Sequence, residues 1–440
     1  MEVSLYDILS ARETRVRLQQ QMLQEYKCPI ICFTMNIAGP IKNTPLIQRG
    51  FQAGMDALSK QIPTDWIRKK IVESAPTGDT AIYAVQMDAD KLKNICQQIE
   101  DSTPLGRLFD MDVIDLGGKK LERSIPRNCI VCGALGRGCA ARRIHSVTEL
   151  QNVTQQILKE HFETSDPDWI ASKAVQSLID EVNTTPKPGL VDQRNNGSHK
   201  DMTLQHFLDS ANALLPYFRK CVKIGQENRH LSPGNTFPLL RQAGLEAEKV
   251  MYQATGGVNT HKGAIYTMGI LCGSIGRLWT AEKPVEDISK VLTECSALVQ
   301  ESAKSDLASA NGTTAGEQTY LQYGIGGIRT EVAAGLPSVA NIAIPCYQKA
   351  LEAGLSQNNA GFITLLHLIS NVEDTNLYHR GGKAGATWAS AAASALLTEM
   401  HCPTFEKLAA LDDAFIARNL SPGGCADLLA VTYFLHSLST

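Results

Sequence analysis

The chain has 440 residues, a length that corresponds to roughly two or three domains. Hydrophobic residues make up 43% of it and charged residues 20%, as in an ordinary soluble globular protein, and the net charge of −3 argues against a nucleic-acid-binding protein. Twelve cysteines are scattered singly except for Cys129 and Cys132, which favours a reducing compartment over a disulfide framework. No signal peptide is recognisable, and the longest apolar run, residues 386–397, is shorter than the ~20 residues of a membrane span, so we expect a cytoplasmic protein.

The first 165 residues alternate between helical and strand patterns. Helices are predicted over residues 5–26, 44–60, 65–74 and 88–101, the last with Asp88 as its N-cap. Apolar runs bounded by turn residues predict strands over residues 29–37, 81–87, 108–115 and 121–125. We therefore expect an α+β domain over residues 1–165.

From Asp166 onward nearly every segment has a helical pattern. Long runs rich in Ala, Leu and Glu predict helices over residues 168–183, 204–224, 239–252, 264–279, 285–303, 386–398 and 426–437. No convincing strand pattern occurs in this half. A larger all-α domain is expected over residues 166–440, with the boundary in or before the first of these helices.

Five polar segments punctuated by glycine interrupt the helical half. They cover residues 187–202, 256–263, 326–331, 373–382 and 421–427. Glycine frees backbone N–H groups, and the start of a helix favours anions because its first N–H groups lack partners. Any single segment is most simply an ordinary loop. Five together predict the rim of one site for a polyphosphate and a sugar.

Cations, amides and hydroxyls in these segments are candidates for substrate binding. They are Lys187, His199, Lys200, Asn259, His261, Lys262, Arg329, Asn376, His379, Arg380 and Ser421, with the backbone of Gly423 and Gly424. Carboxylates are candidates for catalysis, as a base for a hydroxyl or as contacts to Mg²⁺. They are Asp192, Asp201, Glu331, Asp374 and Asp427. Helix or loop capping is the competing interpretation of Asp192, Asp201 and Asp374.

The ordered motifs of this half resemble those of triphosphoribosyl-dephospho-CoA synthase. The likeness runs from about Ile170 to the C-terminus and is carried by residues 187–202, 259–263, 373–382 and 419–430. It implies an all-α enzyme that takes ATP and 3′-dephospho-CoA, displaces adenine and forms 2′-(5″-triphosphoribosyl)-3′-dephospho-CoA. The α linkage implied for that product requires inversion, hence a base on the 2′-hydroxyl, and the triphosphate implies Mg²⁺. Cys425 stands where a serine is more usual in this family.

Two carboxylates in the first half form a candidate site for phosphoryl transfer. Asp110 and Asp112 lie in the predicted strand 108–115, in which side chains two residues apart share a face. Such a pair suits Mg²⁺ for attack at phosphorus, although a solvated strand face explains it equally well. The next stretch, residues 119–143, holds seven basic residues against one acid and suits a triphosphate or an acidic protein partner.

Three thiols and an imidazole lie within that basic stretch and just after it. Cys129, Cys132, Cys139 and His145 have the spacing C-x2-C-x6-C-x5-H. Zinc takes such ligands tetrahedrally, but the spacing is not one of the common finger patterns. A structural Zn²⁺ and ordinary structural thiols therefore compete as interpretations.

The first half resembles holo-citrate lyase synthase, the apo-citrate lyase phosphoribosyl-dephospho-CoA transferase, over roughly residues 5–160. The likeness is carried by residues 36–42, by Glu100 with residues 106–113, and by residues 127–145. It implies transfer of phosphoribosyl-dephospho-CoA to a serine of the citrate lyase acyl carrier (gamma) subunit, with release of pyrophosphate. Lys42, Arg107 and Arg127 are the cations that we expect to bind substrate there.

The two resemblances fit together, because the product of one enzyme is the substrate of the other. The sequence thus predicts a bifunctional transferase that makes and attaches the citrate lyase prosthetic group, with the apo carrier subunit as partner and with neither nucleic acid nor membrane. Three alternatives stay open at this point. The same chemistry would also suit malonate decarboxylase; a zinc and basic module could bind RNA or protein beside a helical scaffold; a helical glycohydrolase could release adenine or ribose to water. The negative net charge argues against RNA.

Overall fold

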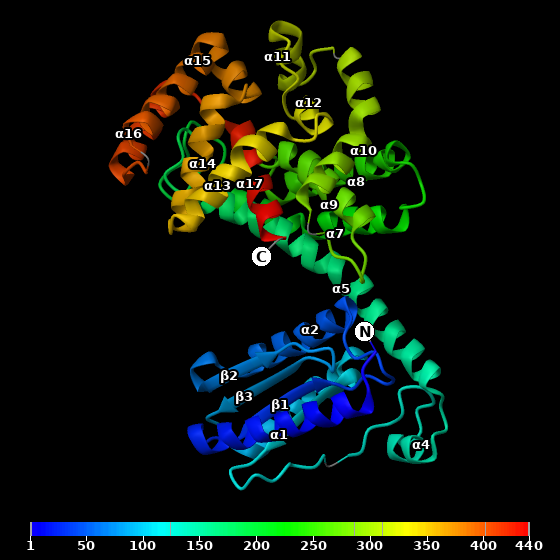
Figure 1. Cartoon of the computed structure of the whole chain (residues 1–440). Helices are drawn as coiled ribbons and strands as arrows, with labels where there is room; N and C mark the ends of the chain where they lie inside the picture. The colour runs from blue at the N-terminus through cyan, green and yellow to red at the C-terminus, as the bar shows by residue number, and fades with distance from the viewer. Residues whose placement is uncertain (1, 124, 286, 310, 401, 439–440) are drawn as a thin grey trace. The chain divides into compact units, whose positions relative to one another are not determined.

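A computed structural model gives the fold over residues 2–123, 125–285, 287–309, 311–400 and 402–438 (Figure 1). The chain forms two compact units. One comprises Met1–Ser165 with Ala281–Lys283, and the other comprises Asp166–Thr280 with Pro284–Thr440. The first contains helices and a sheet, and the second has only helices and turns among its described residues, which confirms the predicted fold class.

The α+β unit is built on a four-stranded antiparallel sheet. Its strands are β1 (Ile30–Met35), β2 (Ile67–Glu73), β3 (Thr80–Val85) and β4 (Phe109–Ile114), in the order β2-β3-β1-β4. Its helices are α1 (Leu5–Tyr26), α2 (Pro45–Gln61), α3 (Ala89–Ser102), the short α4 (Gly136–Arg142) and the first part of α5 (Val147–Asn183), with 3-10 turns at Thr64–Trp66 and Leu105–Leu108. Asp88 caps α3 through the N–H groups of Asp90 and Lys91, as predicted.

Helices cover both faces of this sheet (Figure 1). On one face, Phe33 of β1 stacks on Phe51 of α2 with ring centroids 4.7 Å apart, in a core that α3 also lines. On the other face, Met22 of α1 packs with Ile30 and Cys32 of β1. The sheet is therefore the middle layer of three, and its central strands are buried on both sides.

The alternation of side chains along β4 determines on which face of the sheet its two carboxylates lie. Met111 and Val113 are fully buried in the core with α2 and α3. Asp112 pairs in register with Cys32, which belongs to the α1 side. Because neighbouring strands in register share faces, Asp110 and Asp112 lie on the α1 side of the sheet.

The helix predicted over residues 65–74 is wrong, because residues 67–73 form a strand after the 3-10 turn. Lys, Arg and Glu are good helix formers, but the segment is the edge strand β2, which pairs with β3 from Ile67 to Glu73 and keeps most side chains exposed. The predicted strand 121–125 is also wrong. Only the Ile114–Lys120 bridge and the 2.9 Å hydrogen bond from Leu121 N–H to the Val113 carbonyl continue the pairing, and Ser124 lies outside the described residues.

The helical unit contains the second part of α5 and twelve further helices among the described residues. They are α6 (Leu204–Ala213), α7 (Leu215–Glu227), α8 (Pro233–Ala254), α9 (Lys262–Leu278), α10 (Ile288–Ala308), α11 (Ala315–Tyr323), α12 (Gly327–Ala333), α13 (Ile344–Glu352), α14 (Gln357–Asn371), α15 (Thr375–Glu399), α16 (Phe405–Ala417) and α17 (Gly423–Ser437), with a π-helical turn at Val339–Ala343. Residues 204–224, predicted as one helix, are divided between α6 and α7 because Pro216 begins a new helix.

Helices α9 and α17 form the centre of this unit. They pack against each other, and nearly all of α9 from Ala264 to Gly276 and all of α17 from Leu428 to Leu435 is buried. A helix that is apolar on every side is stable only inside a protein. The second and fifth polar segments lie at the N-terminal ends of these helices, where Lys262 and Asp427 stand on the first turns.

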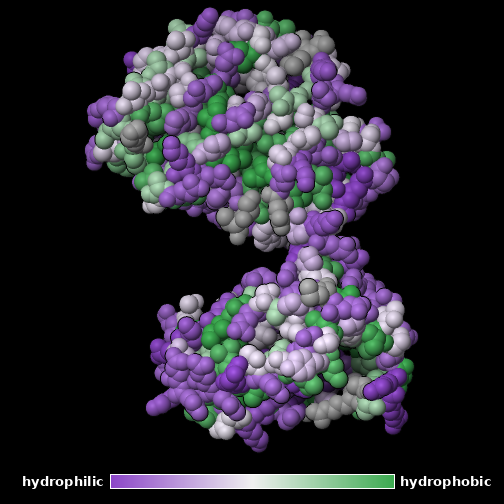
Figure 2. All heavy atoms as spheres, viewed as in Figure 1, coloured by the Kyte–Doolittle hydropathy of each residue, from purple (hydrophilic) through white to green (hydrophobic). Residues whose placement is uncertain are grey.

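Hydrophilic side chains cover much of the visible surface of each unit, with hydrophobic residues in scattered patches (Figure 2). Among the described residues, no helix has both the length and the hydropathy needed to cross a membrane.

Two candidate active sites

The polar segments of the helical unit contact one another at the start of α17. Ser198 Oγ donates to the Leu420 carbonyl at 2.6 Å, and a Cβ placed on Gly189 would lie 2.1 Å from the same oxygen. A Cβ placed on Gly263 would lie 2.0 Å from Asp427 Oδ2. The first and second segments therefore both pack on the end of the chain that leads into α17. Glycine is required at position 189, where φ is +69° and the neighbouring atom belongs to the backbone.

The third and fourth segments join the same cluster. A Cβ on Gly327 would lie 2.6 Å from Cγ2 of Thr375, and one on Gly424 would lie 3.1 Å from Oδ2 of Asp374. All five segments thus belong to one group of neighbouring residues, which is hereafter called the polar cluster.

Much of the polar cluster is helical, although the sequence pattern placed its segments between helices. Helices α9, α12, α15 and α17 begin at Lys262, Gly327, Thr375 and Gly423. The side chains of Asn376, His379 and Arg380 therefore stand on the first turns of α15, and Gly423 and Gly424 open α17. The first N–H groups of a helix lack intrahelical partners, and side chains already cap several of them at α9, α15 and α17. The N–H groups that remain at these helix starts favour anions.

His199 connects three of the segments. Its Nε2 lies 2.9 Å from Ser421 Oγ, and Arg380 donates to its Nδ1 at 3.1 Å. Because a guanidinium can only donate, the ring proton is on Nε2 and is donated to Ser421. Burial, and then the charge of Arg380, lowers the pKa of His199 to about 4. Arg380 also donates to the Ser198 carbonyl at 3.0 Å and to Asn419 Oδ1 at 3.1 Å, so it positions the loop.

Asp374 caps two helices at once. Its Oδ1 accepts from the N–H groups of Asn376 at 2.7 Å and Leu377 at 3.3 Å, and its Oδ2 accepts from Cys425 N–H at 2.8 Å. The side chain is buried, and desolvation raises its pKa against the opposing effect of these hydrogen bonds. Both oxygens are engaged with backbone, so the geometry favours capping, the competing interpretation of the sequence. Cys425 contributes its N–H group to this contact.

Asp427 differs from the other carboxylates of the polar cluster. It stands on the first turn of α17 against Gly263, is half-buried, and has no hydrogen-bond partner among the described residues. Desolvation, and then the negative charges of Glu181 and Asp374, raises its pKa well above the ordinary range. A carboxyl group in this condition is suited to accept a proton from a substrate.

Lys187 and Asp192 are engaged within the protein. The buried Lys187 ammonium contacts the Glu181 carboxylate and donates to the Glu181 carbonyl at 2.8 Å. Asp192 accepts from the N–H groups of Lys187 and Arg194, both at 2.7 Å. These contacts favour a loop-forming role for both residues.

Asp412 is a buried member of the cluster that the motif analysis missed. Its Oδ1 accepts from Gly189 N–H at 2.8 Å, and its Oδ2 accepts from Arg194 at 2.5 Å and from Asn195 Nδ2 at 2.8 Å. The side chain is fully buried in α16. An aspartate on the apolar face of a helix was its only signal in the sequence.

His261 offers one unpaired atom to the cluster. Its Nδ1 lies 2.7 Å from Ser210 Oγ, whereas its Nε2 is buried and has no hydrogen-bond partner among the described residues. Burial, and then the charge of Lys187, lowers its pKa to about 3, so the imidazole is neutral. Buried polar atoms are normally paired, which leaves Nε2 available to a ligand or an ordered water.

The remaining candidates of the helical unit lie at its exposed margin or beside the cluster. Those exposed are Lys200, Asp201, Asn259, Lys262, Asn376 and His379. Lys262 pairs with Glu248 at 2.9 Å, and Arg329 lies 3.9 Å from Glu317. Glu331 accepts from Ser338 N–H at 2.7 Å, and burial raises its pKa.

In the α+β unit, Asp110 and Asp112 project from one face of β4. Asp112 pairs with Lys120 at 2.6 Å. Asp110 has no hydrogen-bond or ion-pair partner among the described residues, and its pKa is raised by desolvation and then by the charge of Asp112. The two carboxylates are therefore unequal, with Lys120 neutralising one of them.

An arginine cluster centred on Glu100 lies along the outer edge of β4, where it contacts the backbone of Phe109 and Met111. The buried Glu100 carboxylate accepts from Met111 N–H at 2.7 Å and pairs with Arg123 and Arg127, both at 2.5 Å. Arg127 also donates to the Phe109 carbonyl at 2.5 Å. Glu100 thus ties α3, β4 and the arginine loop together.

Arg107 completes the arginine cluster. It donates to the Asn128 carbonyl, and its pKa is lowered by desolvation and then by the charge of Arg127. Three guanidinium groups meet two acids here, Glu100 and Asp101, so the excess charge is positive. An anion placed beside Arg107 would relieve that excess.

Lys42 stands in the loop that follows β1. Its ammonium donates to the Ile37 carbonyl, and burial lowers its pKa. An open cavity of about 340 Å³ lies next to it in sequence and is lined by Asn43, Thr44, Gln48 and Ser74, among others. The cavity therefore offers uncharged polar groups, and Lys42 itself is not among the residues that line it.

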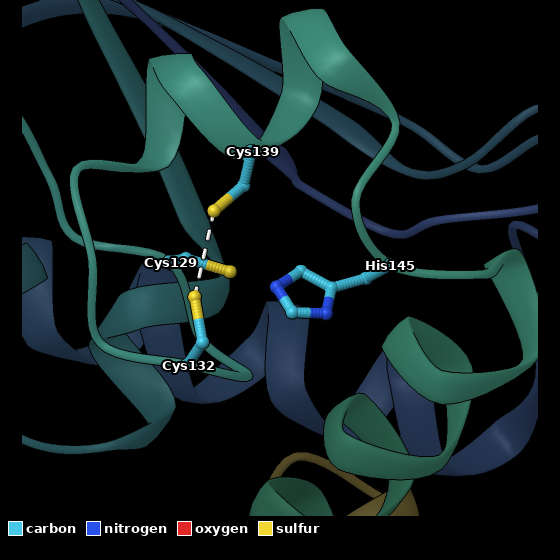
Figure 3. A group of neighbouring side chains, drawn as sticks. All are labelled: Cys129, Cys132, Cys139 and His145. Carbon is cyan, nitrogen blue, oxygen red and sulfur yellow. Dashed lines mark hydrogen bonds between the residues drawn. The ribbon is translucent and has the colours of Figure 1, made fainter.

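The predicted metal ligands come together after β4 (Figure 3). One ligand atom from each of Cys129, Cys132, Cys139 and His145 lies within 4.8 Å of all the others. Desolvation raises the pKa of Cys129, but hydrogen bonds from the N–H groups of Cys132 and Val131 outweigh it and lower the pKa overall.

The fold and these sites define a two-unit enzyme that handles phosphates. Each unit brings together cations or helix starts and a carboxylate that has no hydrogen-bond partner among the described residues. The family described as ATP:dephospho-CoA triphosphoribosyl transferase (CitG) matches residues 167–440, and the apo-citrate lyase phosphoribosyl-dephospho-CoA transferase family (CitX) matches residues 3–161. The chain belongs to the family of CitXG fusion proteins.

Curated relatives support both halves. The chain is 36% identical to Protein CitXG of Haemophilus influenzae over 99% of this chain and 96% of that protein, and 33% identical to Protein CitXG of Leuconostoc mesenteroides subsp. cremoris over 99% and 97%. The 2-(5″-triphosphoribosyl)-3′-dephosphocoenzyme-A synthase of Klebsiella pneumoniae is 39% identical over 61% of this chain and 90% of that protein.

Family membership confirms the function predicted from the motifs. The chain is a bifunctional transferase that combines triphosphoribosyl-dephospho-CoA synthesis from ATP and dephospho-CoA with phosphoribosyl-dephospho-CoA transfer to apo-citrate lyase. The matched family specifies citrate lyase, so malonate decarboxylase is disfavoured, and a binding module or a glycohydrolase gains no support.

Proposed function

We propose that Asp427 is the base of the synthase reaction in the helical unit. In that reaction the 2′-hydroxyl oxygen of 3′-dephospho-CoA bonds to C1′ of the ATP ribose, the C1′–N9 bond breaks, and adenine leaves with the bonding electrons. The hydroxyl proton passes to the Asp427 carboxylate. The observation that carries this assignment is that Asp427 is half-buried, has a raised pKa and lacks a hydrogen-bond partner among the described residues.

The carboxylate charge also suits the oxocarbenium character of such a displacement, because positive charge develops at the anomeric carbon. Direct attack by the 2′-hydroxyl would invert that carbon and give the α linkage. No covalent enzyme intermediate is needed, and no second carboxylate has to act as nucleophile.

The starts of α12 and α17 are proposed to bind the triphosphate through the N–H groups that Asp374 does not cap, together with the Ser421 hydroxyl. His199 occupies a Ser421 lone pair at 2.9 Å, which leaves the hydroxyl proton for a phosphate oxygen. Mg²⁺ is expected with ATP, and Asp201, exposed and without a hydrogen-bond partner among the described residues, would hold it there to neutralise triphosphate charge.

Asp427→Asn tests the assignment. Adenine release from ATP and dephospho-CoA should fall by roughly 10²-fold or more, the usual contribution of a positioned base. Transfer of separately supplied triphosphoribosyl-dephospho-CoA to the apo carrier should stay at the wild-type rate. Asp209→Asn, an exposed aspartate on α6, is the matched control. Wild-type adenine release by Asp427→Asn would refute the proposal.

For the α+β unit, we propose that the serine hydroxyl of the citrate lyase acyl carrier subunit attacks the α-phosphorus of triphosphoribosyl-dephospho-CoA. The serine O–P bond forms, the bond to the β-phosphate breaks, and pyrophosphate leaves. Asp110 is proposed to take the serine proton, and its lack of a partner among the described residues supports this role. Mg²⁺ held by Asp110 and Asp112 would neutralise charge on the α-phosphate, provided that Lys120 leaves Asp112.

The arginine cluster is proposed to hold the pyrophosphate leaving group. Arg107 carries this role best, because the guanidinium of Arg127 is already bound to Glu100 and to the Phe109 carbonyl. Exposed cations of the stretch 119–143, such as Lys119, Arg142 and Arg143, would meet an acidic carrier surface. The side chain of Arg137 lies outside the described part of this stretch.

A further inference from the structure

We infer that Cys129, Cys132, Cys139 and His145 bind one zinc ion, and that this ion positions the arginine cluster of the transfer site. The four ligand atoms lie within 4.8 Å of one another (Figure 3). In a tetrahedron with Zn–S bonds of about 2.3 Å, sulfur atoms lie about 3.8 Å apart. The Cys132 and Cys139 sulfurs are 3.4 Å apart, so little adjustment is needed to reach that geometry.

The imidazole supplies an independent observation. The Nε2 atom of His145 is buried and has no hydrogen-bond partner among the described residues. Figure 3 shows the ring facing the three sulfurs. A disulfide between Cys132 and Cys139 would leave this nitrogen and the Cys129 thiol without a function, whereas a metal ion uses all four groups.

The backbone around the first ligand is also arranged for a metal. Val131 N–H donates to Cys129 Sγ at 3.4 Å, Cys129 N–H donates to the Ala134 carbonyl at 2.6 Å, and Gly133 N–H donates to the Cys129 carbonyl at 3.0 Å. These bonds fold residues 129–134 into a tight turn that presents two thiols from one side. Thiolate and imidazole ligands in a set of four select zinc over hard cations.

The same turn carries the contacts of the arginine cluster. Gly136 N–H donates to the Arg127 carbonyl at 3.0 Å, and Asn128 forms a bridge with Leu135. The Asn128 carbonyl, one residue before Cys129, accepts from Arg107. Arg127 reaches Glu100 from two residues before Cys129. A metal that holds Cys129 therefore also positions Arg107, which we assign to pyrophosphate, and Arg127. Hydrogen bonds around a metal site commonly couple its ligands to neighbouring groups in this way.

The metal can be tested without measuring activity. Elemental analysis of the full-length protein should give one zinc per chain, and Co²⁺ replacing it should give the intense absorption of thiolate coordination. Cys132→Ser should abolish both signals, and Cys402→Ser, a half-buried thiol of the helical unit, should change neither. Protein that holds no zinc and gives no thiolate–Co²⁺ absorption after reconstitution would overturn the metal site.

The positioning role rests on the proposed pyrophosphate site, so its test is kept separate. His145→Ala should release the metal and raise the KM for triphosphoribosyl-dephospho-CoA by roughly ten-fold or more, with adenine release unchanged. His145→Cys should retain zinc and a near wild-type KM. An unchanged KM in metal-free His145→Ala would overturn the positioning role. If instead Arg107→Gln leaves KM unchanged while zinc is bound, the pyrophosphate assignment fails and the metal site stands.

Discussion

The Nε2 atom of His199 lies 2.9 Å from the Oγ atom of Ser421, although the two residues are 222 positions apart in the chain. This bond joins the loop after α5 to the start of α17. Arg380 of α15 fixes the other ring nitrogen, so three distant segments depend on one neutral imidazole. Protonation of His199 would therefore disturb the contacts among all three segments of the polar cluster.

We expect the helical unit to lose stability as the pH falls below about 6.5. The pKa of His199 is lowered from 6.5 to about 4, so the unfolded chain takes up a proton that the folded chain refuses. The stabilising contribution is complete above the unfolded pKa and is lost as the pH falls through about 4.

Urea unfolding at several pH values, followed by tryptophan fluorescence, measures this effect. Three of the four tryptophans lie in the helical unit. His199→Gln should make the pH dependence less steep and leave the part that arises from His261, whose pKa is also lowered. His230→Gln, which changes an exposed histidine, should leave the slope as in the wild type. Equal slopes for His199→Gln and the wild type would contradict the expectation.

Asp110→Asn should stop attachment to the carrier while adenine release continues. Loss of a positioned carboxylate costs roughly 10²-fold or more in rate, and the two reactions use different units. Mass spectrometry of the carrier measures attachment, and adenine is quantified in the same mixture. Asp56→Asn on α2 is the control. Near wild-type carrier modification by Asp110→Asn would remove Asp110 from the mechanism.

Asp374→Ala should destabilise the helical unit by about 2 kcal/mol, since each of two helix caps contributes ~1 kcal/mol. The sequence interpretation placed this carboxylate in catalysis, but its oxygens are held by three backbone N–H groups. Adenine release per folded molecule should change little at a temperature where the variant is folded. Melting temperature and adenine release on one sample decide the matter: a variant that keeps its melting temperature but is inactive would restore the catalytic role.

Glu100→Gln should destabilise the α+β unit by about 3 kcal/mol, because it leaves the charges of Arg123 and Arg127 uncompensated beside a buried group. Calorimetry of the full chain should show one transition lowered and the other unchanged. Glu13→Gln, on the exposed side of α1, is the matched control. A shift in both transitions would mean that the effect is not local to the arginine cluster.

Local patterns predicted much of the fold. Residues 5–26 are helical as expected, and the alternating segment 108–115 contains β4. The prediction failed where pairing decided the structure: residues 65–74 have helix-forming side chains, but hydrogen bonding to β3 makes residues 67–73 a strand. The break between α6 and α7 was signalled by Pro216 and was overlooked.

The sequence predicted which residues belong to the site, but it predicted only part of their arrangement in space. Motifs indicated which polar segments matter, and their contacts through Gly189, Gly263 and Gly327 required the tertiary structure. Whether a carboxylate is a cap or a base depends on its hydrogen bonds, which separate Asp374 from Asp427. Asp412 was missed because its partners lie more than 200 positions away in the chain.

The close approach of Gly263 to Asp427 has a consequence for how such a bifunctional chain tolerates mutation. A single methyl group at position 263 would lie 2.0 Å from the Asp427 carboxylate oxygen, far inside contact distance. It would displace the proposed base with no change in charge and no loss of a polar group. The synthase activity therefore depends on the absence of a side chain at position 263. Substitution of this glycine, which takes no part in the chemistry, should be tolerated as poorly as substitution of the aspartate that it faces.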